Sequence, residues 1–257
     1  MRLASLGGPQ AFQRLEHLLG VRELAEGDHR ALEALGALLA QLESLVEGQD
    51  QLGRVVLTER LPIPELPLPG FASPLRRGAE LAGAPTLVTV FSATSPESRL
   101  VLERLERAKQ SFDQAGLRLV PLTIDPPDER AGARALLEEH GLGEHAGYVD
   151  ERSRLSIEVL LSGLFGATRS TPLPTSFLLD RKGRIAVVYL GRVRPAWLRA
   201  DATILLTEAE DVTHGGALGG GYWLFPLKRS YGKMLRAFEM LGERDQADVY
   251  RELRRDG

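Results

Sequence analysis

The most informative hydrophobic pattern in the chain is the apolar, β-branched run Leu87–Phe91, which leads through a polar turn into an amphipathic segment. Such a run, bounded by turn-forming residues, predicts a buried strand. Ser95 is a suitable N-cap, Pro96 suits the first helical position because its φ angle is fixed, and Glu97 meets the positive end of the helix dipole. The predicted helix ends at Gly116 and buries a stripe of residues at helical spacing. The stripe consists of Val101, Leu102, Leu105, Ala108 and Phe112.

Strand and helix patterns alternate beyond this corner and predict an α/β domain. The next strand is expected at 117–124, and a strand–helix–strand unit of this length implies parallel pairing. Helices are expected at 129–140 and 153–164. Two further apolar runs, 175–179 and 185–190, flank Asp180-Arg-Lys-Gly183 and predict a β-hairpin with glycine in its turn.

The N-terminal part of the chain has a helical pattern instead. Segments 9–19 and 29–46 predict a helical hairpin, and its leucine stripe is too apolar to remain in water. A short strand is expected at 55–58. The proline-rich segment 61–70 then predicts an extended arm, because proline cannot donate to a sheet ladder.

The C-terminal part predicts helices as well. A helix at 201–211 is followed by a glycine-rich linker at 215–221. Helices at 231–241 and 245–254 then form a second hairpin, which resembles one tetratricopeptide unit. Because one such unit cannot bury its own apolar faces, we expect the two terminal hairpins to pack on each other or on the central sheet.

The strand–turn–helix corner resembles the active-site corner of the thioredoxin-like superfamily, in particular its redoxin and TlpA-like branch, which includes AhpC/TSA-related proteins. In that branch the strand runs into Trp-Cys-x-x-Cys-Arg, often with proline after the first cysteine. Aligned on this pattern, Thr94 stands at the tryptophan position, Ser95 and Ser98 stand at the two cysteine positions, and Pro96 and Arg99 match. The chain contains no cysteine.

A second, more specific resemblance lies in the segment Pro174-Thr-Ser-Phe-Leu-Leu-Asp-Arg-Lys-Gly-Arg-Ile185. It is similar to the family signature Pro-Thr-x-Phe-Leu-x-Asp-x-x-Gly-x-Ile, whose proline is cis and faces the cysteine loop. The resemblance therefore implies a cis bond before Pro174. It also implies a degenerate redox site made of Thr94, Ser95, Pro96, Glu97, Ser98 and Pro174.

The expected fold class is α/β, with a thioredoxin-like mixed β-sheet flanked by helices and with helical hairpins at both ends. We expect an N-terminal helical region at 1–60, a thioredoxin-like domain at 61–200 and a C-terminal helical extension at 201–257.

Composition and charge exclude several classes of function. The chain is 43% hydrophobic and 26% charged, with a net charge of −3, which is ordinary for a globular protein and predicts no nucleic-acid partner. No apolar segment approaches the ~18 residues of a membrane span. Because cysteine is absent, disulfides, thiolate metal sites and thiol catalysis are excluded together.

Other candidate sites are weaker. A serine nucleophile at Ser95 or Ser98 would need a nearby base, and no histidine is close in sequence. His140 and His145 lack the i, i+4 spacing of a helical zinc pair, so we expect solvated loop residues there. The glycines at 215–221 lack the lysine of a phosphate loop. No cofactor and no metal is expected.

The sequence therefore predicts a redox-inactive thioredoxin-like module that acts as a protein-interaction or scaffold domain. The alternative is a thiol-disulfide oxidoreductase or peroxiredoxin-like enzyme whose cysteines have been converted to Ser95 and Ser98. The expected partner is an unidentified protein or another domain of a longer chain. The resemblance favours a location outside the cytoplasm, whereas a native N-terminus without a signal peptide would favour the cytoplasm.

Overall fold

The computed structural model describes residues 53–64, 68–71, 78–165, 172–208, 218, 222–224 and 231–256. The chain divides into two compact units, Met1–Gln49 and Asp50–Gly257, and all described residues belong to the second. The predicted N-terminal hairpin lies outside the described residues.

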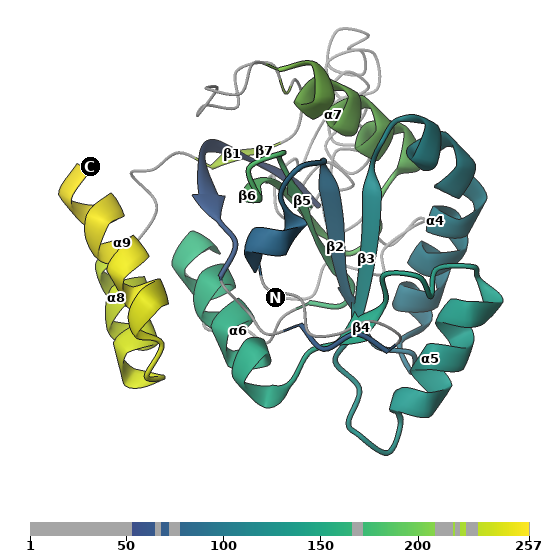
Figure 1. Ribbon diagram of the computed structural model, residues 1–257, viewed down its shortest axis with the longest axis horizontal. Coiled ribbons are helices and arrows are strands. Elements are labelled where there is room, and N and C mark those ends of the chain that lie inside the picture. The colour runs from purple at the N-terminus through teal and green to yellow at the C-terminus, as the bar shows by residue number, and fades with distance from the viewer. Residues whose placement is uncertain are drawn as a thin grey trace, which may run out of the picture. The chain divides into compact units, whose positions relative to one another are not determined.

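The described residues form one seven-stranded sheet with the strand order β4-β3-β2-β5-β6-β1-β7 (Figure 1). In chain order the strands are β1 (Arg54–Pro62), β2 (Thr86–Phe91), β3 (Arg118–Thr123), β4 (Gly147–Tyr148), β5 (Thr175–Leu179), β6 (Arg184–Leu190) and β7 (Tyr222–Leu224). The helices are the 3₁₀ turn η1 (Gly78–Leu81), α4 (Pro96–Gln114), α5 (Arg130–Glu139), α6 (Glu151–Phe165), α7 (Pro195–Thr207), α8 (Tyr231–Met240) and α9 (Arg244–Asp256).

The pairing directions in the centre of the sheet are those of a thioredoxin-like fold. Strands β2 and β3 are parallel and are joined through α4, as the strand–helix–strand pattern predicted. Strand β5 runs antiparallel to β2, and β6 runs antiparallel to β5. Helix α7 then follows β6. The α/β fold class predicted from the sequence is thus confirmed.

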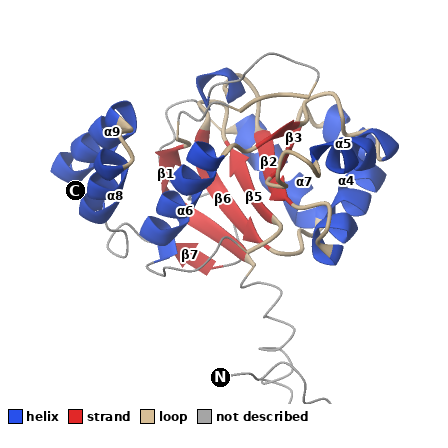
Figure 2. Ribbon diagram, turned by 90° about the horizontal axis from the view of Figure 1, so that it is seen from below, coloured by secondary structure: helices blue, strands red, loops and turns tan. Residues whose placement is uncertain are grey.

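Helices cover both faces of this sheet, and each face has its own apolar core (Figure 2). Because side chains alternate along a strand, Val88 and Val90 of β2 join the core under α6, whereas Leu87 and Phe91 join the core under α4 and α7. All residues of β2 are buried, as its continuous apolar pattern predicts for a central strand.

The C-terminal helices α8 and α9 form the predicted hairpin and pack on the α6 side of the sheet. Met234 of α8 lies directly over Gly163 of α6, where an added Cβ atom would be 2.2 Å from the methionine Cγ. The rings of Phe238 and Tyr250 stack with 5.3 Å between their centroids, and both are fully buried. Arg152 at the start of α6 forms an ion pair with Glu243 in the turn between α8 and α9.

Several elements differ from the sequence prediction, among them β4, which was not predicted. Helix α7 begins at Pro195 and ends at Thr207, so the expected helix at 201–211 was predicted to start six residues too late and to end four residues too late. Pro195, with its preset φ angle, starts the helix. Within the segment expected to be a linker, Leu218 is fully buried, and β7 follows at 222–224 without having been predicted. Strand β1 extends well beyond the expected 55–58, because its pairing with β6 continues to Pro62.

Candidate functional site

The corner between β2 and α4 is built as the sequence predicted. Strand β2 ends at Phe91, and Ser95 is the N-cap of α4 with extended backbone angles (φ −83°, ψ 119°). Its Oγ accepts a hydrogen bond from the backbone N–H of Ser98 at 3.3 Å. This bond satisfies one of the helix's unpaired first-turn donors, so the Ser95 hydroxyl has a structural role.

Ser98 has a second structural role inside the corner. The residue is fully buried, whereas Ser95 is half-buried. Ser98 Oγ accepts a hydrogen bond from the backbone N–H of Ser92 at 3.3 Å. This contact joins the first turn of α4 to the end of β2, so both serines at the cysteine positions help to hold the loop that connects strand and helix.

A carboxylate that the sequence did not single out, Asp125, organises the same loop. Asp125 follows β3, is 4% exposed, and accepts a hydrogen bond from Ser92 Oγ at 2.5 Å. Its other oxygen accepts hydrogen bonds from the Ala93 N–H at 2.8 Å and from Thr123 Oγ1 at 2.7 Å. Thr94 Oγ1 lies 2.8 Å from Ser92 Oγ and completes the cluster. A carboxylate with several donors fixes its neighbours firmly.

The predicted cis bond is present between Leu173 and Pro174. Its position relative to the corner follows from the sheet register, because Thr175 pairs with Val90 near the end of β2. The Pro174 carbonyl accepts a hydrogen bond from the Gly191 N–H at 2.8 Å, which connects this loop to the end of β6. The two family-like segments, 94–98 and 174 onward, thus lie at the same end of the sheet.

An ion pair joins the loop after β6 to the first turn of α4. The guanidinium of Arg192 donates two hydrogen bonds to the Glu97 carboxylate, at 2.6 and 2.9 Å. Hydrogen bonding to Arg192 lowers the pKa of Glu97 below its usual 4.5. Sequence analysis named Glu97 as a dipole partner and did not identify Arg192, which lies 95 positions away.

Replacing Arg192 with alanine should therefore raise the Glu97 pKa towards its ordinary value. The ion pair stabilises the corner above that ordinary pKa, and its contribution is lost as the pH falls through the lowered pKa. Carboxyl ¹³C shifts recorded against pH would measure the change. Glu151, whose pKa is lowered by Arg154, is the matched control and should titrate unchanged. Equal shifts at Glu97 and Glu151 would contradict the pairing.

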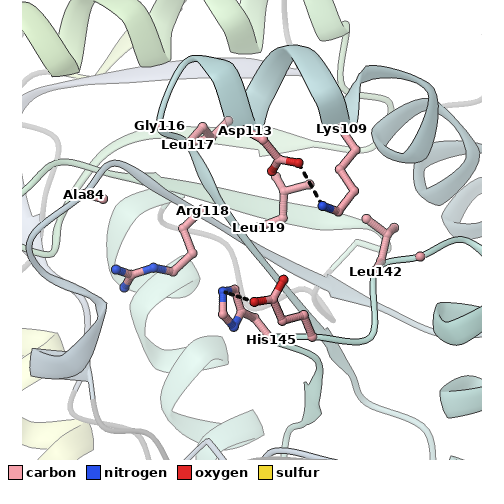
Figure 3. Close-up of a pocket in the computed structure, with 11 residues that line it drawn as sticks. Ala84, Lys109, Asp113, Gly116, Leu117, Arg118, Leu119, Leu142 and His145 are labelled. Atoms are coloured by element: carbon pink, nitrogen blue, oxygen red, sulfur yellow. Dashed lines mark hydrogen bonds and ion pairs between the residues drawn. The ribbon is translucent and has the colours of Figure 1, made fainter.

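The two histidines considered from the sequence, His140 and His145, each pair with a different glutamate. His140 Nδ1 is 2.6 Å from Glu106 Oε2. His145 lies beside Glu144 in a cavity of about 280 Å³ between the end of α4, the start of β3 and the loop before β4 (Figure 3). Lys109 and Asp113 form an ion pair in the same cavity at 2.9 Å. Within the described residues, no group of three or more histidine, aspartate or glutamate side chains is placed to hold a metal ion.

The described helices include none that is both long and apolar enough to cross a lipid bilayer. At the corner, the Ser95 and Ser98 hydroxyls each accept a hydrogen bond from a backbone N–H group, and His140 pairs with Glu106 away from the corner.

Comparison with known proteins finds solved structures that resemble this chain, but no matching sequence family. No family model matches the chain, and no curated protein matches it. A putative thiol:disulfide interchange protein DsbE from Chlorobium tepidum is 18% identical, with a TM-score of 0.44 over 63% of this chain and 99% of that chain. A thiol:disulfide interchange protein from Bacteroides sp. is 14% identical, with a TM-score of 0.47 over 60% and 94%. A thio-disulfide isomerase from Thermus thermophilus is 15% identical, with a TM-score of 0.44 over 59% and 98%.

The fold itself is decided by the chain's own strand order and by the pairing directions of its central strands. The protein has a thioredoxin-like fold, with serine at both positions where the Cys-x-x-Cys motif of that superfamily has cysteine.

Proposed function

We propose that this chain is a protein-binding module that uses the thioredoxin-like fold without thiol chemistry. The observation that supports the proposal most directly is that both serine hydroxyls form hydrogen bonds within the corner. Ser95 caps α4 and Ser98 bonds to the end of β2, so each is accounted for by local structure. Disulfide exchange needs a thiolate, and a serine hydroxyl at neutral pH neither attacks a disulfide nor forms one.

The Asp125 cluster supports the binding role. A loop held by Asp125, Ser92 and Thr123 presents the exposed Thr94 and half-buried Ser95 on a preformed surface. A preformed surface loses less conformational entropy when it binds a partner than a mobile loop does. The corner is therefore the surface on which we expect a partner protein to bind.

Activity measurements test the absence of thiol chemistry. The unaltered protein should neither reduce insulin nor consume peroxide above the buffer rate. The double variant Ser95→Cys/Ser98→Cys should gain measurable insulin reduction, because a thiolate at the start of α4 is stabilised by the helix N-terminus. The single variant Ser98→Cys, which has no partner cysteine, is the control. Turnover by the unaltered protein would overturn the proposal.

Site-specific crosslinking tests the binding role. A photoreactive amino acid at Thr94 should crosslink to one specific protein in cells, whereas the same group at the exposed Ala135 of α5 should not. The crosslinked protein, once purified, should bind the unaltered chain saturably in calorimetry and bind a Thr94→Arg variant weakly. Identical crosslinks at both positions, or no saturable binding, would refute the corner as the binding surface.

One observation favours the oxidoreductase alternative. Position 95 is half-buried and position 98 is fully buried, which would suit an accessible attacking thiol and a protected second thiol. If the natural gene encodes cysteine at both positions, the alternative replaces the binding proposal. Serine codons at both positions would support the binding module.

A further inference from the structure

A second cavity, of about 210 Å³, lies at the end of the sheet opposite the corner. It is formed where the turn from β5 to β6 meets β1 and the end of α7. Because β5 runs antiparallel to β2, this turn is next to the start of β2, and the cavity shares no lining residue with the degenerate redox site.

The cavity has an excess of positive charge among its described lining residues. The cationic side chains are Arg60, Arg181, Lys182 and Arg184, and the carboxylates are Asp180 and Glu208. Four cations against two anions leave a formal excess of two positive charges. Arg60 is 6% exposed, whereas Lys182 is exposed, so the charge extends from the interior to the cavity mouth.

The Asp180 carboxylate is already saturated by protein donors. One oxygen accepts hydrogen bonds from the backbone N–H groups of Lys182 and Arg184, both at 2.9 Å. The other accepts from Arg60 Nη1 at 3.1 Å and from Arg184 Nε at 2.9 Å. Arg181 donates to the Glu208 backbone carbonyl at 2.6 Å, which neutralises no charge.

Two buried polar atoms at this cavity have no hydrogen-bond partner. Arg60 donates through Nη1 to Asp180 and through Nη2 to Glu208, but its Nε lacks an acceptor. Glu208 accepts from Arg60 with Oε2, but its Oε1 lacks a donor. Buried polar groups are nearly always satisfied, and here an unpaired donor and an unpaired acceptor belong to two residues that line the same cavity.

We propose that this cavity binds a small protonated oxyanion, of the class of inorganic phosphate. The oxyanion accepts hydrogen bonds from Arg60, Arg181 and Lys182, which offsets the excess positive charge. Its remaining P–OH group donates to Glu208 Oε1. Sulfate at neutral pH has the same shape but no proton, so its oxygens would meet the Glu208 carboxylate without a hydrogen bond between them.

Calorimetry on the intact chain, at constant ionic strength and neutral pH, tests this site with inorganic phosphate, methyl phosphate and sulfate as probes. We expect saturable phosphate binding, with sulfate about tenfold weaker because one charge-assisted hydrogen bond is lost. Amide shifts in ¹H–¹⁵N spectra should be confined to the cavity lining, at Arg60, Gly83, the β5–β6 turn and the end of α7 around Leu205 and Glu208. Methyl phosphate has no P–OH group at neutral pH, because the second pKa of a phosphate monoester is about 6, so it should bind as weakly as sulfate. Tighter binding of methyl phosphate than of inorganic phosphate would overturn the role of the P–OH donor.

Two variants separate affinity from selectivity. Lys182→Ala, on an exposed side chain, should weaken phosphate about tenfold. Glu208→Gln should reduce the preference for phosphate over sulfate, because the amide can donate to either anion. Lys109→Ala, in the other cavity, is the control and should change nothing. Equal binding of phosphate and sulfate, or binding unaffected by Lys182→Ala, would overturn the proposal.

Discussion

Replacing Asp201 with alanine is expected to lower the free energy of unfolding by about 3–5 kcal/mol, because it leaves a buried charge without its partner. Asp201 of α7 accepts two hydrogen bonds from Arg54 of β1, at 2.5 and 2.8 Å, and one from the Tyr189 hydroxyl at 2.5 Å. The Arg54 and Asp201 side chains are only 5% and 4% exposed. Burial raises the pKa of Tyr189 well above 10.0, so at neutral pH its hydroxyl keeps the proton that it donates.

Urea denaturation would measure this change, and two controls define its origin. Asp113→Ala removes an exposed i, i+4 pair with Lys109 and should cost no more than about 0.5 kcal/mol. The triple variant Arg54→Met/Tyr189→Phe/Asp201→Leu replaces all three of these polar side chains with apolar ones. It should be more stable than Asp201→Ala, because no charge remains buried. If the triple variant is less stable than Asp201→Ala, the polar side chains that remain in Asp201→Ala contribute more to stability than the buried Arg54 charge costs.

Replacing Gly163 with valine is expected to detach the C-terminal hairpin from α6 or to cost about 1–3 kcal/mol through overpacking. An added Cβ atom would lie 2.2 Å from Cγ and 2.3 Å from Sδ of Met234. Detachment would expose Met234, Leu235 and Phe238, all buried in the core that α6 shares with the sheet. Hydrogen exchange across α8 and α9, together with the unfolding midpoint, would measure the effect.

A second substitution should relieve this overpacking. Gly163→Ala combined with Met234→Ala makes room for the new Cβ atom, so the two substitutions should couple favourably in a double-mutant cycle. Gly132→Ala in α5 is the matched control: nothing lies within 4 Å of its added Cβ atom, so the helix should be unchanged or more stable. Additive effects of Gly163→Ala and Met234→Ala would show that the two residues are not in contact.

The candidate site divides into parts that sequence reasoning found and parts that it missed. Ser95 as the N-cap, Pro96 at the helix start and the cis bond before Pro174 were predicted and confirmed. The roles of Asp125 and Arg192 were missed. Asp125 directly follows a predicted strand, and that position was an available signal, but its donors Ser92 and Ala93 are more than 30 residues away.

By itself, the sequence determined the features that depend on neighbours within one or two turns of the chain. The buried run of β2, the cap of α4 and the β5–β6 turn are local patterns, because period and turn chemistry act over a few residues. Only the tertiary structure decided the contacts between distant segments. The Arg54–Asp201 pair spans 147 positions, and the Arg60–Asp180 pair beside the second cavity spans 120. An arginine and an aspartate have many possible partners in a chain, and strand order and register select which of them meet.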